Sequence, residues 1–422
     1  MQYFLAPRFI HPDRNHRNKH MKQLHISIIG AGLGGLCLAQ MLKRAHIAFD
    51  VFERDSAPNS RTQGYRIRID AAGQRALAAS LPESLYTLFR ETASIAASTG
   101  QFLTPQLERT LEERIPESWR SNTDKENPIK DEDLRVNRQT LREILMTGIE
   151  DHIHFNHAFD HYVLKQDGRV EVYFDNRSPI SSDALVGADG VNSAVRSQLA
   201  PDALPLDTGS ICIYGKTQLK KLNDHALDNG MRVIFANGFT AIFDDICFKA
   251  PLPDIAACIE PRCSLTPIDD YLYWALIGPK SRFGIGHSTV SQQELQAVLH
   301  KVMFDVTEDW HLTIQQIIRQ TDLSAVAMLP IRNGRPEIAW KTGSVTLLGD
   351  AIHAMSPAGG VGANTALKDA SLLGSMFAKI DSENGEITNA LNDYEKQMRA
   401  WAIEAIASSN RGAERLFKMS TA

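Results

Sequence analysis

The stretch from Ile26 to Glu53 constrains the fold of this chain more than any other. A short apolar strand is followed by a glycine turn, an apolar helix and a second strand that ends in an acid. The turn carries Gly30, Gly32 and Gly35 in the spacing GxGxxG. In such a unit the first glycine permits a tight turn, the second lets a pyrophosphate approach, and the third lets the helix pack on the sheet. The pattern predicts a βαβ unit that binds an adenine dinucleotide.

Two further features support this interpretation. The helix after the turn presents free N–H groups and the positive end of its dipole to the phosphates. Glu53 follows at about the distance expected for a carboxylate that accepts hydrogen bonds from ribose hydroxyls. The alternative is a glycine-rich turn between strand and helix that binds no ligand.

The bulk composition is that of an ordinary globular protein. The chain has 422 residues, of which 43% are hydrophobic and 23% charged, and its formal net charge is -5. This length allows two or more lobes, and the charge implies no nucleic-acid binding. The five cysteines show no CxxC spacing, so neither a disulfide framework nor a zinc site is suggested, and a reducing cytoplasm fits best. We expect no membrane span and no metal.

The rest of the chain contains two more junctions between an apolar strand and a turn. Residues 184–196 read as a buried strand that runs into Asp189-Gly190 and a helix, and residues 344–364 read as a strand, Gly349-Asp350, a glycine-rich turn and another helix. Residues 201–334 differ in texture, and several of their segments read as strands of a mostly antiparallel sheet. Residues 389–416 are expected to form a long amphipathic helix against the nucleotide-binding part.

These three motifs, in this order, resemble those of the single-component FAD-dependent aromatic hydroxylases. This family includes para-hydroxybenzoate hydroxylase, salicylate hydroxylase, the tetracycline-inactivating monooxygenases and many polyketide-tailoring monooxygenases. The resemblance covers residues 26–416. It implies an α/β fold with a Rossmann-like FAD-binding domain of the glutathione-reductase type, an inserted and mostly antiparallel β substrate lobe, and a C-terminal helix.

The expected division of the chain follows from this resemblance. Residues 1–20 are basic and are expected to be a disordered extension or to precede the true start at Met21. The other expected parts are a discontinuous FAD-binding domain of residues 21–95, 135–200 and 335–422, a surface excursion of residues 96–134, and a substrate lobe of residues 201–334.

The resemblance also implies roles for residues beyond the first turn. Asp350 would bind a ribityl hydroxyl, and the amides of Gly362, Ala363 and Asn364 would face the pyrimidine edge of the flavin, where negative charge develops on reduction. Asp189 would contact FAD and the route of NAD(P)H, or would cap a helix. The cofactor-binding candidates are Gly30, Gly32, Gly35, Glu53, Arg54, Arg61, Gly64, Arg68, Arg138, Asp189, Asp350, Gly362 and Ala363.

The arginines among these candidates have different expected partners. Arg138 matches a family residue in the phosphate–ribityl region, or is a surface arginine of its helix. By position, Arg68 resembles a residue near FAD and Arg61 a contact of the nicotinamide cofactor, a role that Arg66 could share. NAD(P)H would have no domain of its own, and the arginines favour NADPH. His353 resembles a histidine of the turn near the flavin rather than a catalytic base.

The implied reaction is hydroxylation of an aromatic or polyketide-like small molecule with NAD(P)H and O₂, through a flavin C4a-hydroperoxide. No catalytic residue of the protein can be named, and the candidates near the substrate are Pro357, Tyr214, Phe235, Phe243 and Tyr273, which could equally be core. The alternatives are a flavin-dependent halogenase, oxidase or reductase, a tetracycline-type inactivating enzyme, a non-catalytic FAD-binding module, and a plain NAD-dependent dehydrogenase. No motif in the sequence indicates the identity of the substrate or the oligomeric state.

Overall fold

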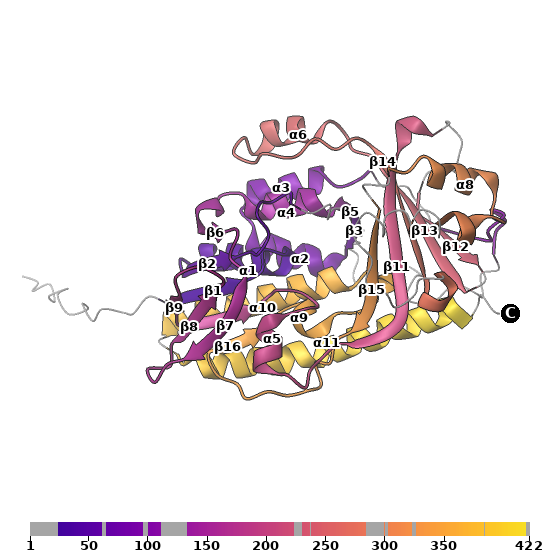
Figure 1. The fold of residues 1–422 in the computed structure, drawn as a ribbon. Coiled ribbons are helices and arrows are strands. Elements are labelled where there is room, and N and C mark those ends of the chain that lie inside the picture. The colour runs from indigo at the N-terminus through magenta and orange to yellow at the C-terminus, as the bar shows by residue number, and fades with distance from the viewer. Residues whose placement is uncertain are drawn as a thin grey trace, which may run out of the picture.

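The computed structural model describes most of the chain, namely residues 24–60, 65–95, 100–110, 133–222, 230–236, 238–283, 299, 303–322, 326–383 and 385–418. The expected N-terminal extension and two of the candidate residues, Arg61 and Gly64, lie outside this part. The described elements form two lobes that lie side by side in Figure 1.

A five-stranded sheet, parallel throughout, is the centre of the first lobe. Its order is β16-β10-β1-β2-β6. The strands β10 and β16 are buried along their whole length, as expected for strands that are covered on both faces. The bounds are β1 His25–Ile29, β2 Ala48–Phe52, β6 Ile153–His154, β10 Ala184–Gly187 and β16 Val345–Leu347.

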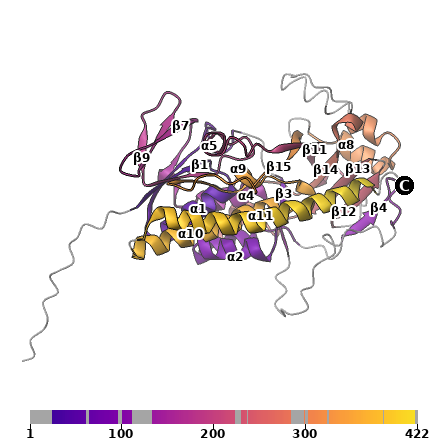
Figure 2. The ribbon, with the colours of Figure 1, turned by 90° about the horizontal axis from the view of Figure 1, so that it is seen from below.

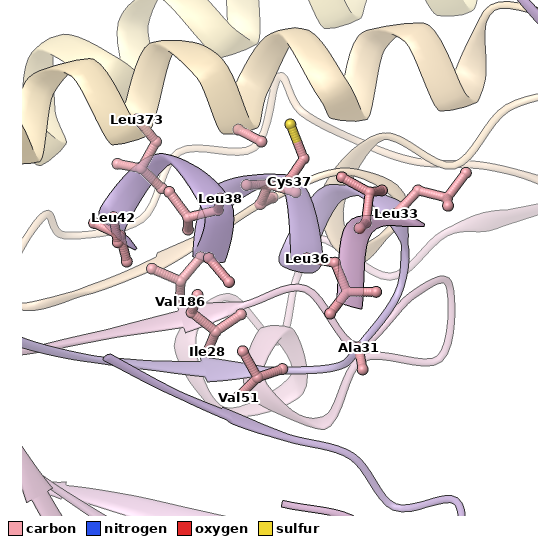
Figure 3. Packing of buried hydrophobic residues seen from close by; sticks show 14 of the residues in the cluster. Ile28, Ala31, Leu33, Leu36, Cys37, Leu38, Leu42, Val51, Val186 and Leu373 are labelled. Atoms are coloured by element: carbon pink, nitrogen blue, oxygen red, sulfur yellow. The ribbon is translucent and has the colours of Figure 1, made fainter. Parts of the chain in front are cut away.

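Helices cover this sheet, and α1 packs between it and α10. In Figure 3, Leu36 of α1 points towards the strands that carry Ile28 and Val51, while Leu373 of α10 lies on the opposite side of α1. This stacking fixes where the N-termini of the two helices lie. The helices of this lobe are α1 Leu33–Arg44, α2 Ala71–Ser80, α3 Glu83–Glu91, α4 Arg138–Met146, α5 Ala194–Leu199, α9 Asp350–His353, α10 Gly362–Glu383 and α11 Ile387–Lys418.

The last helix, α11, is the long amphipathic helix that the sequence predicts. It lies along the bottom of the molecule in Figure 1 and crosses in front of both lobes in Figure 2. It is fastened to the parallel sheet by the hydroxyl of Tyr394, which donates to the carbonyl oxygen of Leu347 in β16 over 2.9 Å. No helix in the described part of the chain is both long enough and apolar enough to cross a lipid bilayer.

A six-stranded sheet forms the second lobe, in the order β15-β11-β14-β13-β12-β4. Its pairings are antiparallel except that of β12 with β4. The strand β4 corrects one expectation, because it lies inside the segment 96–134 that we expected to be only a surface excursion. The bounds are β4 Gln101–Leu103, β11 Leu206–Gln218, β12 Arg232–Ala236, β13 Phe239–Ile246, β14 Tyr271–Pro279 and β15 Ala327–Asn333, with α8 Leu312–Arg319 on one face.

Two smaller sheets accompany the two main sheets. A ribbon of β3 and β5 lies between them in Figure 1, and a three-stranded sheet, β7-β8-β9, follows β6. Their bounds are β3 Arg66–Ile69, β5 Leu134–Asn137, β7 Phe159–Leu164, β8 Val170–Phe174 and β9 Ile180–Ser182, and the helix α6 spans Leu252–Ile259. The division into domains at the expected boundaries stays a prediction.

Candidate functional site

The three sequence motifs meet at one edge of the parallel sheet. Gly30 follows β1, Asp189 follows β10, and Asp350 follows β16. These strands are neighbours and run in the same direction, so their carboxyl ends lie side by side. In open α/β sheets this edge is where ligands bind. Motifs far apart in the sequence therefore form one site.

The first turn has the geometry that a dinucleotide requires. Gly30 has a φ of 106°, and a Cβ there would lie 2.5 Å from the carbonyl oxygen of Ala188. A Cβ on Gly35 would lie 2.2 Å from the carbonyl oxygen of Gly30, so only glycine allows α1 to start this close to the strand. A Cβ on Gly32 would meet nothing within 4 Å. The turn is thus closed at two glycines and open at the third, where a pyrophosphate needs room.

Two side chains fix the shape of this turn from outside. The carboxylate of Glu53 accepts hydrogen bonds from the backbone N–H of Ala31, over 3.0 Å, and of Asp55, over 3.1 Å. The guanidinium of Arg142 donates to the carbonyl oxygens of Ala31, over 2.8 Å, and Pro58, over 2.5 Å. Arg54, next to Glu53, is exposed. Arg142 was missed in the sequence, although it lies one helical turn after Arg138 on the same face of α4.

Asp189 caps the helix α5, as one of the two interpretations expected. Its Oδ2 accepts hydrogen bonds from the backbone N–H of Ala194, over 2.8 Å, and of Val195, over 3.3 Å. Its Oδ1 is buried and has no hydrogen-bond partner among the residues that the structure describes. Burial raises the pKa of Asp189, and hydrogen bonds from Ser193 and from these backbone groups oppose that shift. The contact of Asp189 with FAD or NAD(P)H stays a prediction.

Asp350 and the start of α10 form the third part of the site. Gly349 has a φ of 65° and turns the chain so that Asp350 begins α9. The helix α10 begins at Gly362, as expected, and a Cβ there would lie 3.9 Å from Oδ1 of Asp350. The first-turn amides of α10, those of Gly362 and Ala363 among them, have no partners within the helix. An anionic ligand edge beside Asp350 would meet these amides.

The side chain of Asn364 has a structural role in addition to the expected one. Its Oδ1 accepts from the backbone N–H of Asp70 over 3.1 Å, and its Nδ2 donates to the carbonyl oxygens of Arg68, over 3.0 Å, and Gly360, over 3.1 Å. Arg68 also lies beside Gly360 and pairs with Asp133 over 3.2 Å. Asn364 thus fastens the N-terminus of α10 to the strand that carries Arg68.

Arg138 lies where the two lobes meet. Burial and the neighbouring charge of Arg142 lower the pKa of Arg138, while Tyr214, Asp350 and Glu53 act in the opposite direction. The backbone N–H of Arg138 donates to the carbonyl oxygen of Tyr65 over 2.9 Å, at the start of α4. The role of its guanidinium in the site stays a prediction.

The second sheet turns one face to this site and the other to its own core. Tyr214 and Tyr273 lie on the site-facing side together with Phe235. The ring of Tyr65, which precedes β3, meets Tyr214 edge-on at 5.1 Å and lies 6.4 Å from Tyr273. Phe243 is on the opposite side, fully buried with α8. Its candidacy near the substrate is wrong because side chains alternate along a strand and Phe243 faces away.

Arg66 also differs from expectation. It forms an ion pair with the fully buried Asp244 of β13 over 2.7 Å, and Arg135 of β5 binds the other oxygen of Asp244 over 2.7 Å. Arg66 therefore joins the ribbon to the second sheet, and the suggested role in nicotinamide binding is not supported by this contact. Pro357 is exposed at the start of a short 3-10 helix, Pro357–Gly359, in the turn before α10.

His353 is not placed as a catalytic base. It is fully buried, and its Nε2 pairs with Asp369 of α10 over 2.5 Å. The same carboxylate accepts hydrogen bonds from the backbone N–H of Gly349 over 3.1 Å and from the indole of Trp401 over 2.8 Å. The expected interpretation, that His353 belongs to the turn, agrees with these contacts. Within the described ranges no three His, Cys, Asp or Glu side chains are grouped so as to hold a metal.

A comparison with known protein families shows which family this chain belongs to. A family model described as an FAD binding domain matches residues 23–210 and 286–409, which is more than half of the chain. The chain belongs to this FAD-binding family. FAD is accordingly the cofactor of this FAD-binding protein, as the three motifs predict.

Among curated relatives, the FAD-binding protein is 34% identical over 412 residues to the dual O-methyltransferase/FAD-dependent monooxygenase CTB3 of Cercospora beticola. The match covers 93% of this chain and 46% of the relative, so the chain spans about half the length of the curated relatives it matches first. A similar match, 32% identical, is the dual O-methyltransferase/FAD-dependent monooxygenase elcB of Phaeosphaeria nodorum, with 94% of this chain and 46% of that protein covered.

Among solved structures, a protein of Photorhabdus luminescens subsp. laumondii assigned as an FAD-containing monooxygenase superposes with a TM-score of 0.76. The two chains are 28% identical, and the match covers 95% of this chain and 100% of the other. The resemblance to the FAD-dependent monooxygenase family and the α/β fold are therefore confirmed.

Proposed function

We propose that this chain is an FAD-dependent monooxygenase that hydroxylates an aromatic or polyketide-like small molecule with NAD(P)H, NADPH being favoured, and O₂. The observation that supports this most is that the three flavin-type motifs meet at one edge of the parallel sheet, opposite a sheet face lined with tyrosines. The CTB3 and elcB relatives are named dual O-methyltransferase/FAD-dependent monooxygenases, and this chain, which matches the FAD binding domain, spans about half of each.

The residues at this edge of the parallel sheet fit FAD. Gly30, Gly32 and Gly35 with the start of α1 would hold the pyrophosphate, because the space beside Gly32 is open. Glu53 would accept from the adenosine ribose, and Asp350 from the ribityl chain. Bound FAD supplies the redox and oxygen-transfer chemistry.

The chain's own residues would orient the flavin and the substrate. The first-turn amides of α10, at Gly362 and Ala363, would stabilise negative charge on the flavin's pyrimidine edge. Arg138 would add a positive charge between the flavin and the second sheet. Tyr214 and Tyr273 would pack against the substrate ring and exclude water.

The first experiment is to record the visible spectrum of the purified protein, before and after anaerobic addition of NADPH. Flavin bands that bleach on reduction, followed by oxygen uptake with phenolic or polyketide-like compounds and a product that gains one oxygen atom, would support the proposal. Halogenated products, hydrogen peroxide alone, or a reduced substrate would instead indicate the halogenase, oxidase or reductase. A colourless protein that FAD does not reconstitute would contradict the proposal.

Replacement of Asp350 by alanine tests the residue assignment. We expect FAD affinity to fall by about tenfold or more, because a carboxylate that binds a buried hydroxyl contributes about 1.5–3 kcal/mol. The matched control is Asp393→Ala on α11, where the carboxylate is exposed and only approaches Lys396 at 3.8 Å. Titration of apoprotein with FAD, followed by flavin fluorescence, measures both. If the two variants bind FAD with equal affinity, Asp350 does not contact the cofactor.

A further inference from the structure

The carbonyl group of Ala31, in the first glycine turn, is held by Arg142. Arg142 belongs to α4 and is half-buried. Its Nε donates to the carbonyl oxygen of Ala31 over 2.8 Å, and its Nη1 donates to that of Pro58 over 2.5 Å. One planar guanidinium thus joins α4 to the glycine turn and to the loop after β2. The side chain of Gln139, also on α4, reaches the same loop at Asn59 over 3.2 Å.

The hydrogen bond from Arg142 determines which way the peptide between Ala31 and Gly32 points. The described part of the chain contains no cis peptide bond, and a trans peptide carries its C=O and its N–H on opposite sides. Since the C=O of Ala31 faces Arg142, the N–H of Gly32 points away from Arg142. This N–H has no hydrogen-bond partner among the residues that the structure describes, because it lies just before the first turn of α1. It is therefore available to an anionic ligand of the turn.

The glycine that gives the pyrophosphate room also makes this peptide easy to turn over. Rotation of a peptide by about 180° changes the ψ of the residue before it and the φ of the residue after it. The φ of Gly32, −78° in the structure, would become positive, which glycine tolerates without a steric penalty. The C=O of Ala31 would then face the ligand in place of the N–H of Gly32. A carbonyl oxygen repels the oxygens of a phosphate, so this orientation disfavours binding.

We propose that Arg142 is a positioning residue for FAD, which holds the carbonyl of Ala31 away from the cofactor so that the N–H of Gly32 faces the pyrophosphate. Glu53 binds the N–H of Ala31 over 3.0 Å, so the peptides on both sides of Ala31 are fixed. Without Arg142 the turn divides between two orientations, and the affinity for FAD falls with the fraction that stays competent. This inference rests on the FAD binding that the proposed function requires, and not on the reaction.

Replacement of Arg142 by methionine tests this role. Apoprotein is titrated with FAD, and Kd is taken from flavin fluorescence. We expect Kd to rise by about tenfold or more, as when about one molecule in ten keeps the competent turn. The phosphorus NMR resonances of the bound pyrophosphate should shift, whereas the visible spectrum of the flavin should stay that of the wild type. A merely structural role of Arg142 would not move the phosphorus resonances alone.

The matched control is Arg44→Met. Arg44 lies in the last turn of α1, and its guanidinium donates to the carbonyl oxygen of Leu81 over 2.7 Å. The control therefore removes a comparable hydrogen bond at the other end of the same helix. Both Kd and the phosphorus resonances of Arg44→Met should equal those of the wild type.

Three results would overturn the role of Arg142. The first is an equal Kd for Arg142→Met and Arg44→Met, and the second is an unshifted pair of phosphorus resonances in Arg142→Met. The third is a rise in Kd that disappears at high salt, since salt screens a direct attraction between charges but not the orientation of a peptide.

Two further measurements keep the test decisive. If Arg142→Met does not fold, Arg142→Lys takes its place, because it keeps the charge but has a single ammonium instead of the planar fork, and Kd should still rise. Wild-type protein that does not bind FAD would overturn the proposed function and this inference together. Oxidation of NADPH is measured separately, so that a failure of the reaction with FAD still bound is seen apart from a failure of the role of Arg142.

Discussion

Replacing Gly32 by alanine is expected to leave the fold intact and to weaken FAD binding by about tenfold to a hundredfold. The backbone of Gly32 is extended, with a φ of −78° and a ψ of 176°, which alanine adopts readily. An added Cβ meets no protein atom within 4 Å. The methyl group would therefore act against the ligand alone, by occupying the space that the pyrophosphate needs.

Gly35→Ala provides the contrast in the same turn. There an added Cβ would lie 2.2 Å from the carbonyl oxygen of Gly30, so the helix must move away from the strand. We expect the free energy of unfolding to fall by about 1–3 kcal/mol or more. Urea unfolding of both apoproteins and FAD titration of Gly32→Ala separate the two effects. A Gly32→Ala variant that binds FAD as the wild type does would show that the pyrophosphate lies elsewhere.

The buried pair of His353 and Asp369 is expected to be the most sensitive ionic contact of the FAD-binding lobe. Asp369→Asn should reduce the free energy of unfolding by about 3 kcal/mol, near the lower end of the range for a broken buried pair, because the imidazole can lose its proton. Both side chains are fully buried, and Asp369 also holds Gly349 and Trp401. Asp393→Asn, which changes an exposed carboxylate, should alter stability by less than about 0.5 kcal/mol.

The same pair predicts a dependence on pH. Burial by itself would lower the pKa of His353, but the charge and hydrogen bond of Asp369 outweigh it, and the pKa is raised. A raised pKa means that the folded state holds the proton more tightly than the unfolded state. The stabilisation is therefore complete below about pH 6.5, the ordinary value for histidine, and is lost as the pH rises through the raised pKa.

Urea unfolding of the wild type and of Asp369→Asn at about pH 6, about pH 7.5 and about pH 9.5 measures this effect. The difference in free energy of unfolding between the two proteins should shrink towards the alkaline end. A difference that stays constant over this range would mean that His353 is neutral in the folded protein. The pair would then be an ordinary hydrogen bond.

The first βαβ unit could be predicted in detail because its constraints are local. Gly30 is required by its own positive φ and Gly35 by the carbonyl oxygen of Gly30, both within one turn, and the glycine-rich turn before α10 predicted that this helix starts near Gly362. The antiparallel second sheet was predicted because its segments read as strands, and strand character is also a local property. The strand β4 was not, because its pairing with β12 joins segments that are far apart in the chain.

The sequence by itself determined that this protein has a dinucleotide turn, two further turns after buried strands, and an antiparallel sheet. Only the tertiary structure decided that these turns share one edge, that Tyr214 faces them while Phe243 faces away, and that Arg66 pairs with Asp244. The physical reason is that glycine geometry and alternation act between chain neighbours, whereas the face that a strand presents and the partner of a charge depend on how distant elements pack.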